Sequence, residues 1–381
     1  MLPLHSKLPN AQTTIFTVMS ELAAKHDAIN LAQGFPNFLP SPKLIEFAHE
    51  AMQRGQNQYA PMAGLMLLRE RIAVKIAADY GANVHAADEI TITPGGTAAL
   101  FAAMMAIVHK GDEVIVLEPC YDSYLPTLEL CGAAVRRIPL KFPNYAVDWE
   151  AIRQAFTPRT RLLVLNTPHN PTGSVWSAQD MSELAVLTRD SNCIILSDEV
   201  YEHIIFDGKQ HESVLRTPEL AERSMVISSF GKTFHVTGWK TGYCVAPAAL
   251  TKEFRKVYQF MNFAGFTPAQ VAFAEMLQTP QNYKELPAFY EQKRNTFQRL
   301  MEGSRFQLLR SEGSYFQCAT YDAISTMPDG EFAQWLTRER GVATIPVSAF
   351  YADATDHHVI RFCFAKTDET LERAAEILRA V

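Results

Sequence analysis

Short apolar runs recur through the middle of the chain and alternate with stretches of helical periodicity. They occupy residues 90–93, 114–117, 162–165, 193–196, 225–227 and 243–245. Runs that are apolar throughout, rather than alternating, are typical of strands covered on both faces in a largely parallel sheet. Their alternation with helices predicts an α/β domain with a doubly wound, mostly parallel sheet over roughly residues 41–285.

A glycine turn follows the first of these runs. Pro94-Gly95-Gly96 comes directly after residues 90–93 and precedes a helical run at 97–110. We expect that helix to end at Gly111-Asp112, before the next strand.

The pattern changes after about residue 285. Helices are expected around 283–301, at 330–339 and at 367–380, and short strands at 306–309, 315–319 and 359–364. This mixture predicts a smaller α+β domain over residues 286–381. Residues 1–40 are rich in Pro, Asn and Gly and have little periodicity, so we expect an N-terminal arm that also forms part of the small domain.

Composition narrows the class of protein. Of 381 residues, 48% are hydrophobic, and 35 basic against 41 acidic residues give a net charge of −6 with no basic block, which argues against a nucleic-acid partner. The longest apolar stretch, residues 98–108, is too short to cross a bilayer, and the first 14 residues lack the apolar core of a signal peptide. Six cysteines without CxxC spacing favour reduced, buried thiols. We therefore expect a soluble cytoplasmic protein.

The tripeptide Gly231-Lys232-Thr233 is the most conspicuous polar motif. It resembles the end of a nucleotide-binding loop, but such a loop needs a glycine five residues before the Gly-Lys pair, where this chain has Val226. A β-branched residue is unsuited to the positive φ of that turn. The remaining features are Ser229, Lys232 and Lys240 after an apolar strand. They could hold an anion, or one lysine could be covalently engaged, or both could be solvated surface lysines.

Polar residues gather where the predicted strands end, and ligands of open α/β sheets bind beyond those ends. The segments are 94–97, 118–121, 166–173, 197–201 and 228–232. They supply a glycine turn at a helix N-terminus, an aromatic ring, an amide, a carboxylate, a phenol and a lysine. Most have a structural explanation as turn or core residues. Asp198 is harder to explain as a turn or core residue, because an acid at the end of an apolar strand needs a partner.

Together these groups match the needs of one cofactor, pyridoxal 5'-phosphate: a lysine for its aldehyde, a carboxylate for its ring nitrogen, donors for its ring hydroxyl and a cradle for its phosphate. The sequence resembles the class I aminotransferases of fold type I, and within them the methionine and kynurenine–glutamine aminotransferase branch. The matching segments extend over nearly the whole chain: NQYAP, PGGTAAL, NTPHNPTG, SDEVYE, SSFGKTFHVTGWKTGY and IRFCFA.

The resemblance implies a role for each matching residue. Lys232 would bond to the cofactor's aldehyde, and Asp198 would pair with the ring nitrogen. Tyr201 and Asn170 would hydrogen-bond the ring hydroxyl, and Tyr121 would stack on the ring. The phosphate contacts implied are Gly95, Gly96, Thr97, Ser229, Lys240 and, from a second subunit, Tyr59. A metal is not expected, since Glu199, Glu202 and His203 are most simply a polar helix face.

Two positions depart from the pattern of the family. Lys240 stands where arginine is frequent, so the charge is kept and the bidentate fork is lost. Gly95 stands where some members carry a hydroxyl donor, so backbone amides must contribute more to phosphate binding.

The substrate side is implied in the same way. Arg361 would clamp the substrate carboxylate, and Gly34, Asn170 and Phe16 complete the set. No second arginine for a distal carboxylate is apparent. The candidate side-chain pocket is instead apolar or weakly polar: Ile15, Phe16, Phe35, Tyr59, and Phe263 or Phe266 from the partner. We therefore expect transfer of the amino group of methionine or aromatic amino acids to a 2-oxo acid.

Three alternatives remain open at this stage. The same scaffold serves kynurenine or glutamine transamination, and it serves β-elimination from cysteine conjugates. A regulatory domain that only senses the cofactor would need a DNA-binding module, and no basic helix-turn-helix segment precedes residue 40. The resemblance also places Tyr59 across a subunit boundary, which predicts a homodimer with shared sites, to which residues 262–267 also contribute.

Overall fold

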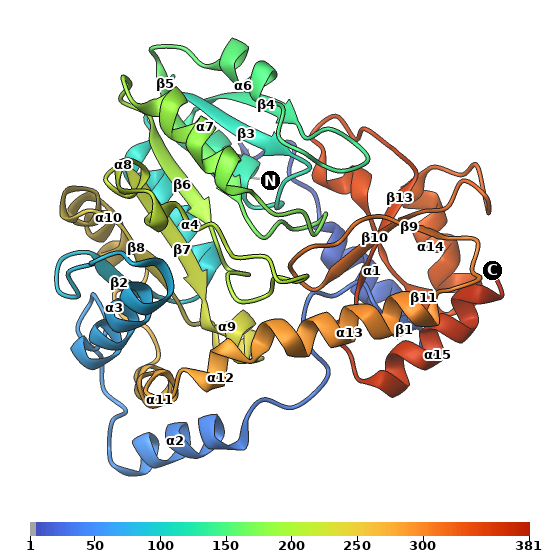
Figure 1. The fold of residues 1–381 in the computed structure, drawn as a ribbon, viewed down its shortest axis with the longest axis horizontal. Coiled ribbons are helices and arrows are strands. Elements are labelled where there is room, and N and C mark those ends of the chain that lie inside the picture. The colour runs from blue at the N-terminus through green and yellow to red at the C-terminus, as the bar shows by residue number, and fades with distance from the viewer. Residues whose placement is uncertain (1–4) are drawn as a thin grey trace.

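The computed structural model describes residues 5–381 and is built around one seven-stranded sheet (Figure 1). Residues 1–4, the start of the predicted arm, lie outside the described residues. The strands are β2 (Ile90–Thr93), β3 (Glu113–Glu118), β4 (Ala134–Pro139), β5 (Thr160–Asn166), β6 (Ile194–Asp198), β7 (Ser224–Ser229) and β8 (Gly242–Val245). Their order is β2-β8-β7-β6-β5-β3-β4, and only β8 runs antiparallel to its neighbours. The predicted α/β fold with a mostly parallel sheet is confirmed.

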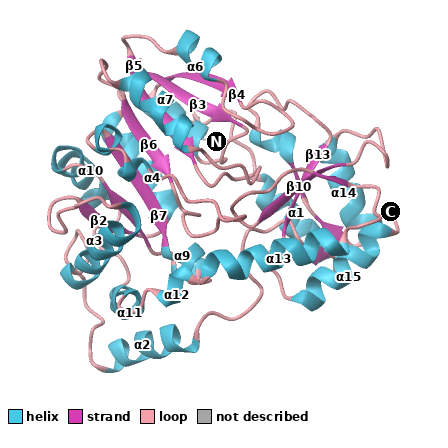
Figure 2. Cartoon of the chain, viewed as in Figure 1, coloured by secondary structure: helices cyan, strands magenta, loops and turns pink. Residues whose placement is uncertain are grey.

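Helices cover both faces of this sheet, as Figure 2 shows. They are α2 (Pro42–Gln53), α3 (Met66–Tyr80), α4 (Gly96–Ile107), α5 (Tyr124–Cys131), α6 (Trp149–Ala155), α7 (Ala178–Thr188), α8 (Pro218–Ala221), α9 (Phe230–Thr233), α10 (Ala248–Met261) and α11 (Thr267–Leu277). Successive side chains of a strand point to opposite faces of the sheet and pack in different hydrophobic clusters. Leu163 and Leu165 of β5 belong to one hydrophobic cluster, and Leu162 and Val164 belong to another. This two-sided burial explains why the strand runs are apolar throughout.

A second group of elements surrounds a separate hydrophobic cluster. It comprises α1 (Ile15–Lys25), β1 (Ile29–Asn30), α13 (Leu286–Leu300), β9 (Gln307–Leu308), β10 (Phe316–Thr320), α14 (Asp329–Arg340), β11 (Val342–Ala343), β12 (Ile345–Pro346), β13 (Val359–Cys363) and α15 (Asp368–Arg379). The short helix α12 (Gln281–Lys284) precedes α13, and its Tyr283 packs in a cluster of the large sheet. A four-stranded sheet, β12-β13-β10-β9, lies at its centre, and β1 pairs with β11. In Figure 1, α13 extends from beside α12 to this group. Tyr201 and Phe206 join the same cluster, so the division at residues 40 and 285 stays a prediction.

Several sequence predictions differ from the structure. The helix predicted to reach residue 110 ends at Ile107, because Val108 is extended and the Asp112 carboxylate accepts the His109 amide. The helix predicted at 283–301 is two helices, α12 and α13. The N-terminal segment contains α1, whose Met19 and Ala23 pack in the second cluster. Strand β4 was missed because it is an edge strand with mostly exposed side chains and therefore shows no apolar run.

The expected polar helix face at 199–203 is wrong. These residues form a turn after β6, and Glu199 and Glu202 are buried. Among the described residues, no group of histidine, cysteine or acidic side chains is arranged to hold a metal ion.

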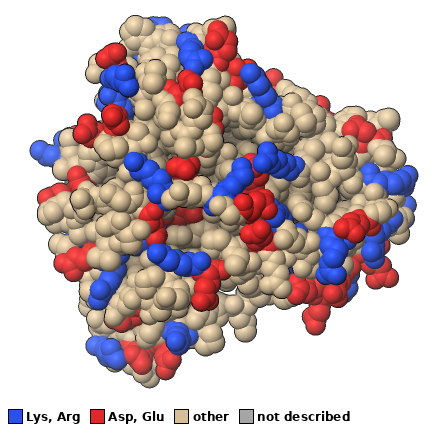
Figure 3. Space-filling model, in the orientation of Figure 1, with Lys and Arg blue, Asp and Glu red and all other residues tan. Residues whose placement is uncertain are grey.

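The surface gives no sign of one dominant charge on the face in Figure 3, where basic and acidic side chains are interspersed. In the part of the chain that the structure describes, no helix is long and apolar enough to span a membrane. The carboxyl ends of β6 and β7 point toward α9, between the two groups of elements (Figure 1). That position is where the candidate site lies.

Candidate active site

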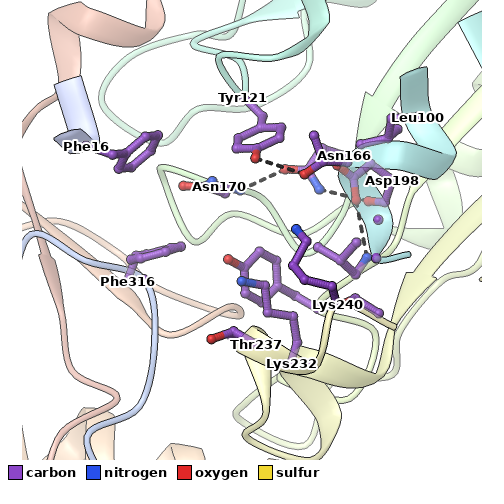
Figure 4. A pocket seen from close by; sticks show the side chains of 18 of the residues that line it. Phe16, Leu100, Tyr121, Asn166, Asn170, Asp198, Lys232, Thr237, Lys240 and Phe316 are labelled. Atoms are coloured by element: carbon purple, nitrogen blue, oxygen red, sulfur yellow. Dashed lines mark hydrogen bonds between the residues drawn. The ribbon is translucent and has the colours of Figure 1, made fainter. Parts of the chain in front are cut away.

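A cavity of about 310 Å³ lies at the carboxyl ends of β6 and β7 (Figure 4). It is lined by most of the predicted site residues: Phe16, Gly34, Gly95, Gly96, Thr97, Tyr121, Asn170, Asp198, Tyr201, Ser229, Lys232, Lys240 and Arg361. These residues come from both groups of elements. The structure therefore brings together residues as far apart in the sequence as Phe16 and Arg361.

Lys232 lies on α9, one helical turn that follows β7 directly. The turn is fixed by Phe230, whose ring stacks on Phe273 of α11 with centroids 4.5 Å apart. The Lys232 Nζ lies 5.6 Å from the centroid of the Tyr201 ring. Burial lowers the pKa of Lys232 to about 8, and the charge of Lys240 acts in the same direction. At pH 7 roughly a tenth of this lysine is therefore the neutral, nucleophilic amine, far more than of an ordinary lysine.

Asp198 ends β6 and is 3% exposed. The Tyr124 hydroxyl donates to its Oδ2 (2.5 Å), and the Val200 amide donates to its Oδ1 (3.3 Å). Burial raises the pKa of Asp198 to about 6 despite these hydrogen bonds. The protein thus holds a carboxylate whose charge is incompletely compensated. A cationic N–H in the cavity would supply that compensation and lower the pKa.

The first turn of α4 forms one end of the cavity. Gly95 caps it with φ of +87°, a conformation that favours glycine. A Cβ built on Gly95 would lie 3.4 Å from the Nζ of Lys240, so this ammonium group lies beside the turn. The Thr97 and Tyr121 hydroxyls are 3.2 Å apart. Free amides at a helix N-terminus together with a lysine make a binding place for a phosphate or another anion.

Arg361 of β13 is fully buried at the opposite side. Its Nη1 donates to Asn170 Oδ1 (2.7 Å) and its Nη2 to the Ala32 carbonyl (2.8 Å). The guanidinium carbon lies 3.8 Å from the centroid of the Phe316 ring. Its Nε has no hydrogen-bond partner among the described residues. A buried guanidinium held against a ring, with a free N–H, is suited to a carboxylate ligand.

Comparison with known proteins identifies the chain. Residues 26–378 match the family model of aminotransferase class I and II. The chain belongs to this aminotransferase family. It is 50% identical to a methionine aminotransferase of Escherichia coli over 98% of this chain and 97% of that protein. It is 34% identical to a kynurenine–oxoglutarate transaminase of Dictyostelium discoideum, over 97% and 95%.

A solved structure of an Escherichia coli protein, whose description names a methionine aminotransferase function, superposes with a TM-score of 0.98. It shows 49% identity and full coverage of both chains. The predicted family and fold are therefore confirmed, and the protein is a transaminase. The individual roles of the site residues stay predictions.

The aminotransferase cavity also contains residues to which the sequence assigned no role. They are Gln33, Leu100, Asn166, Val200, Gly231, Thr237, Thr241 and Phe316. Asn166 was within a strand-end segment, and its Nδ2 donates to the Asp198 carbonyl (2.8 Å) while its Oδ1 accepts the Asn170 amide (2.8 Å). Phe316 lies in a wholly buried strand, where nothing in the sequence distinguishes a cavity wall from core. Tyr124, the donor to Asp198, gave no signal either.

The remaining candidates lie outside this cavity. Tyr59 is 83% exposed and packs edge-to-face on Phe263. Phe35 and Phe266 are also exposed, and the Nζ of Lys366 lies 4.9 Å from the Phe35 ring. Within one chain of the aminotransferase, only Phe16 among the predicted apolar substrate residues reaches the cavity.

The pKa of Lys232 is open to direct test in the protein freed of cofactor. Reductive methylation followed by mass spectrometry, from pH 6 to 11, should give a midpoint near 8 for the Lys232 peptide, against the ordinary lysine value of about 10.4. Because Lys240 lowers this pKa, Lys240→Gln should move the midpoint upward. A Lys232 midpoint near 10 would contradict the electrostatic description of the cavity.

Proposed function

We propose that this aminotransferase uses pyridoxal 5'-phosphate to move the amino group of methionine or aromatic amino acids to a 2-oxo acid. The observation that carries the proposal is one cavity that holds a lysine of lowered pKa, a buried carboxylate and a buried arginine: Lys232, Asp198 and Arg361. When bound, the cofactor supplies an aldehyde for covalent attachment and a ring that withdraws electrons.

The residues present fit this cofactor at three points. Lys232 would bond to the aldehyde as a neutral amine and, when released, would move a proton from the substrate α-carbon. Asp198 would hold the proton of the ring nitrogen, which relieves the cost of its own burial. The phosphate would lie at the first turn of α4 between Gly96, Thr97 and Lys240, with Gly95 making the close turn.

The other cavity residues have positioning roles in this proposal. Tyr201 and Asn170 would donate to the ring hydroxyl, Tyr121 would lie on the ring face, and Ser229 would add a phosphate contact. Arg361 would bind the substrate carboxylate through its planar guanidinium, which the Asn170 bond and the Phe316 ring hold in place. Gly34 lies beside this ring, since a Cβ there would come within 2.8 Å of Phe316 Cζ.

Methionine is the preferred donor in this proposal for two reasons. The 50% identical relative is a methionine aminotransferase. In addition, Phe16 and Phe316 line the cavity beside Arg361, and a thioether packs favourably against aromatic rings. The 34% identical kynurenine relative favours kynurenine as a second donor. An aspartate side-chain carboxylate would be costly to bury there without a cation.

Substrate choice tests this preference. We expect kcat/KM for methionine and phenylalanine to exceed that for aspartate by at least about tenfold, because an uncompensated buried charge costs more than about 1.4 kcal/mol. Half-reactions followed by cofactor absorbance, one amino acid at a time, measure it. Aspartate equal to or above methionine would overturn the preference and leave the transaminase assignment intact.

The role of Lys232 is tested separately. Borohydride should fix the cofactor to the peptide that contains Lys232, as mass spectrometry will show. Lys232→Ala should still bind the cofactor through the phosphate and ring contacts, yet lose turnover by roughly three orders of magnitude or more, because the nucleophile and proton carrier are gone. Substantial transamination by this variant would refute the mechanism.

We further propose a cytoplasmic homodimer with shared sites. The six cysteines are free, and five are buried, which suits a reducing compartment. Tyr59, Phe263 and Phe266 are exposed together on residues that the family resemblance places at the subunit boundary. Burying such aromatic surface against a second copy would favour association. In this arrangement the hydroxyl of Tyr59 would contact the cofactor phosphate bound in the second subunit.

Complementation tests the shared site. In a mixed dimer of Lys232→Ala and Tyr59→Phe subunits, both defects fall in the same site if Tyr59 acts across the boundary, and the other site is intact. Equal mixing with free exchange should then restore one intact site per mixed dimer, about a quarter of wild-type activity. Native mass spectrometry of the mixture verifies subunit exchange. Exchange without any recovery would refute the shared site.

A further inference from the structure

The turn at residues 199–203 has two faces with different environments. Asp198, Val200 and Tyr201 line the cavity. Glu199 and Glu202 alternate with them and do not line it; both are buried in the protein behind the turn. Two acids beneath a catalytic turn require partners, and those partners decide what the turn can do.

Glu202 is enclosed by three side chains that do not line the cavity. Lys75 of α3 donates to its Oε2 (2.6 Å), as does the Tyr80 hydroxyl at the end of the same helix. The Tyr243 hydroxyl of β8 donates to its Oε1 (2.9 Å) and accepts from Lys75 (3.2 Å). Every member of the group is buried. Both carboxylate oxygens and the ammonium are thus committed within one closed network.

Glu199 holds the other end of the turn. Its Oε1 accepts from the Ser197 hydroxyl (2.7 Å) and from the Val214 amide (3.2 Å). Its Oε2 lies 2.8 Å from Nε2 of His211. The backbone is pinned as well, since the Glu199 amide donates to the Ile227 carbonyl and the Ile204 amide donates to the Tyr201 carbonyl (both 2.8 Å).

Stability alone is a weak reason for such a pair. Removing two charges from water costs about as much as their attraction returns, so apolar residues of the same volume would often serve the fold as well. Burial by itself would lower the pKa of Lys75 and raise the pKa of Glu202, but each charge overrides this for the other, and both stay ionised. What an ion pair provides beyond stability is a unique geometry, and here it lies one residue from Tyr201.

We propose that Lys75 and Glu202 are positioning residues that fix Tyr201 at the cavity wall, where the proposed function requires its hydroxyl to meet the cofactor ring. Tyr201 is held laterally by edge-to-face packing on Tyr315 (5.0 Å) and Phe316 (5.9 Å). These contacts restrain the ring from its sides. How far the ring extends into the cavity depends on the position of the backbone of the turn. The network around Glu202 fixes that position, because it ties the turn to α3 and to β8 of the large sheet.

The test compares Glu202→Gln with the loss of an acidic charge elsewhere. Asp207→Asn is the control, because Asp207 also pairs with a buried cation, Arg294, through two hydrogen bonds of 2.7 Å, and it does not line the cavity. Tyr243→Phe removes hydrogen bonds to Glu202 and Lys75 without changing charge. Its control is Tyr145→Phe, whose buried hydroxyl has no hydrogen-bond partner among the described residues. The Tyr243 variant covers the case in which Glu202→Gln fails to fold.

Two readouts separate positioning from general destabilisation. Hydrogen exchange of the cofactor-free protein should become faster in the peptide covering residues 198–204 in Glu202→Gln and Tyr243→Phe, and stay unchanged in both controls. In the holoenzyme, kcat should fall about tenfold with little change in KM, and the midpoint of cofactor absorbance against pH should rise by roughly one unit, because the Tyr201 donor is displaced.

The outcomes are distinguishable. If Glu202→Gln and Tyr243→Phe behave as their controls in both exchange and absorbance midpoint, the positioning role is overturned. If the wild-type protein takes up no pyridoxal phosphate, the proposed function fails, and the exchange comparison still decides whether the network orders the turn.

Discussion

The burial of charge at the ends of β6 and β7 is the constraint on which the rest of the site depends. Asp198, Lys232 and Arg361 are withdrawn from water into one cavity, and none of them has the solvation that its charge would have at the surface. Neighbouring groups are arranged around that deficit: Tyr124 donates to Asp198, and Asn170 accepts from Arg361. In the proposed function, a ligand with a cationic N–H, an aldehyde and anionic groups would relieve the remaining imbalance of charge.

The direction and order of the strands bring these groups together. Parallel strands bring the residues after β5, β6 and β7 to one edge of the sheet, so an amide, an acid and a lysine meet there without long loops. The second group of elements contributes Arg361 and Phe316 from neighbouring antiparallel strands, with Cys318 opposite Arg361 in the register. The cavity therefore lies where two hydrophobic clusters meet, with Phe316 in one and Leu100 packed in the other.

The sequence predicted the parts of the structure that leave a local signal. Six strands of the large sheet are apolar because both faces are covered, and Lys232 drew attention because a Gly-Lys-Thr without a preceding glycine cannot be a nucleotide loop. Edge strand β4 and helix α1 were missed because exposure and irregular flanks weaken their periodicity. Tyr124 and Phe316 were missed for the opposite reason: they are buried aromatics, and only the tertiary structure shows that one contacts Asp198 and the other Arg361. Glu202 was assigned to a polar helix face because a sequence does not show that Lys75 lies opposite it.

Strand β5 shows how tightly the interior and the site are coupled. Its side chains alternate between the two cores, and its last residue, Asn166, bonds to the Asp198 carbonyl and the Asn170 amide. A shift of one residue would move Leu162 and Val164 to the side where Leu163 and Leu165 now pack, and the reverse. It would also turn Asn166 away from both partners. Insertions and deletions in this segment are thus forbidden twice over, by packing and by chemistry. The number of residues between the start of β5 and the Asn-Pro-Thr-Gly turn is therefore fixed.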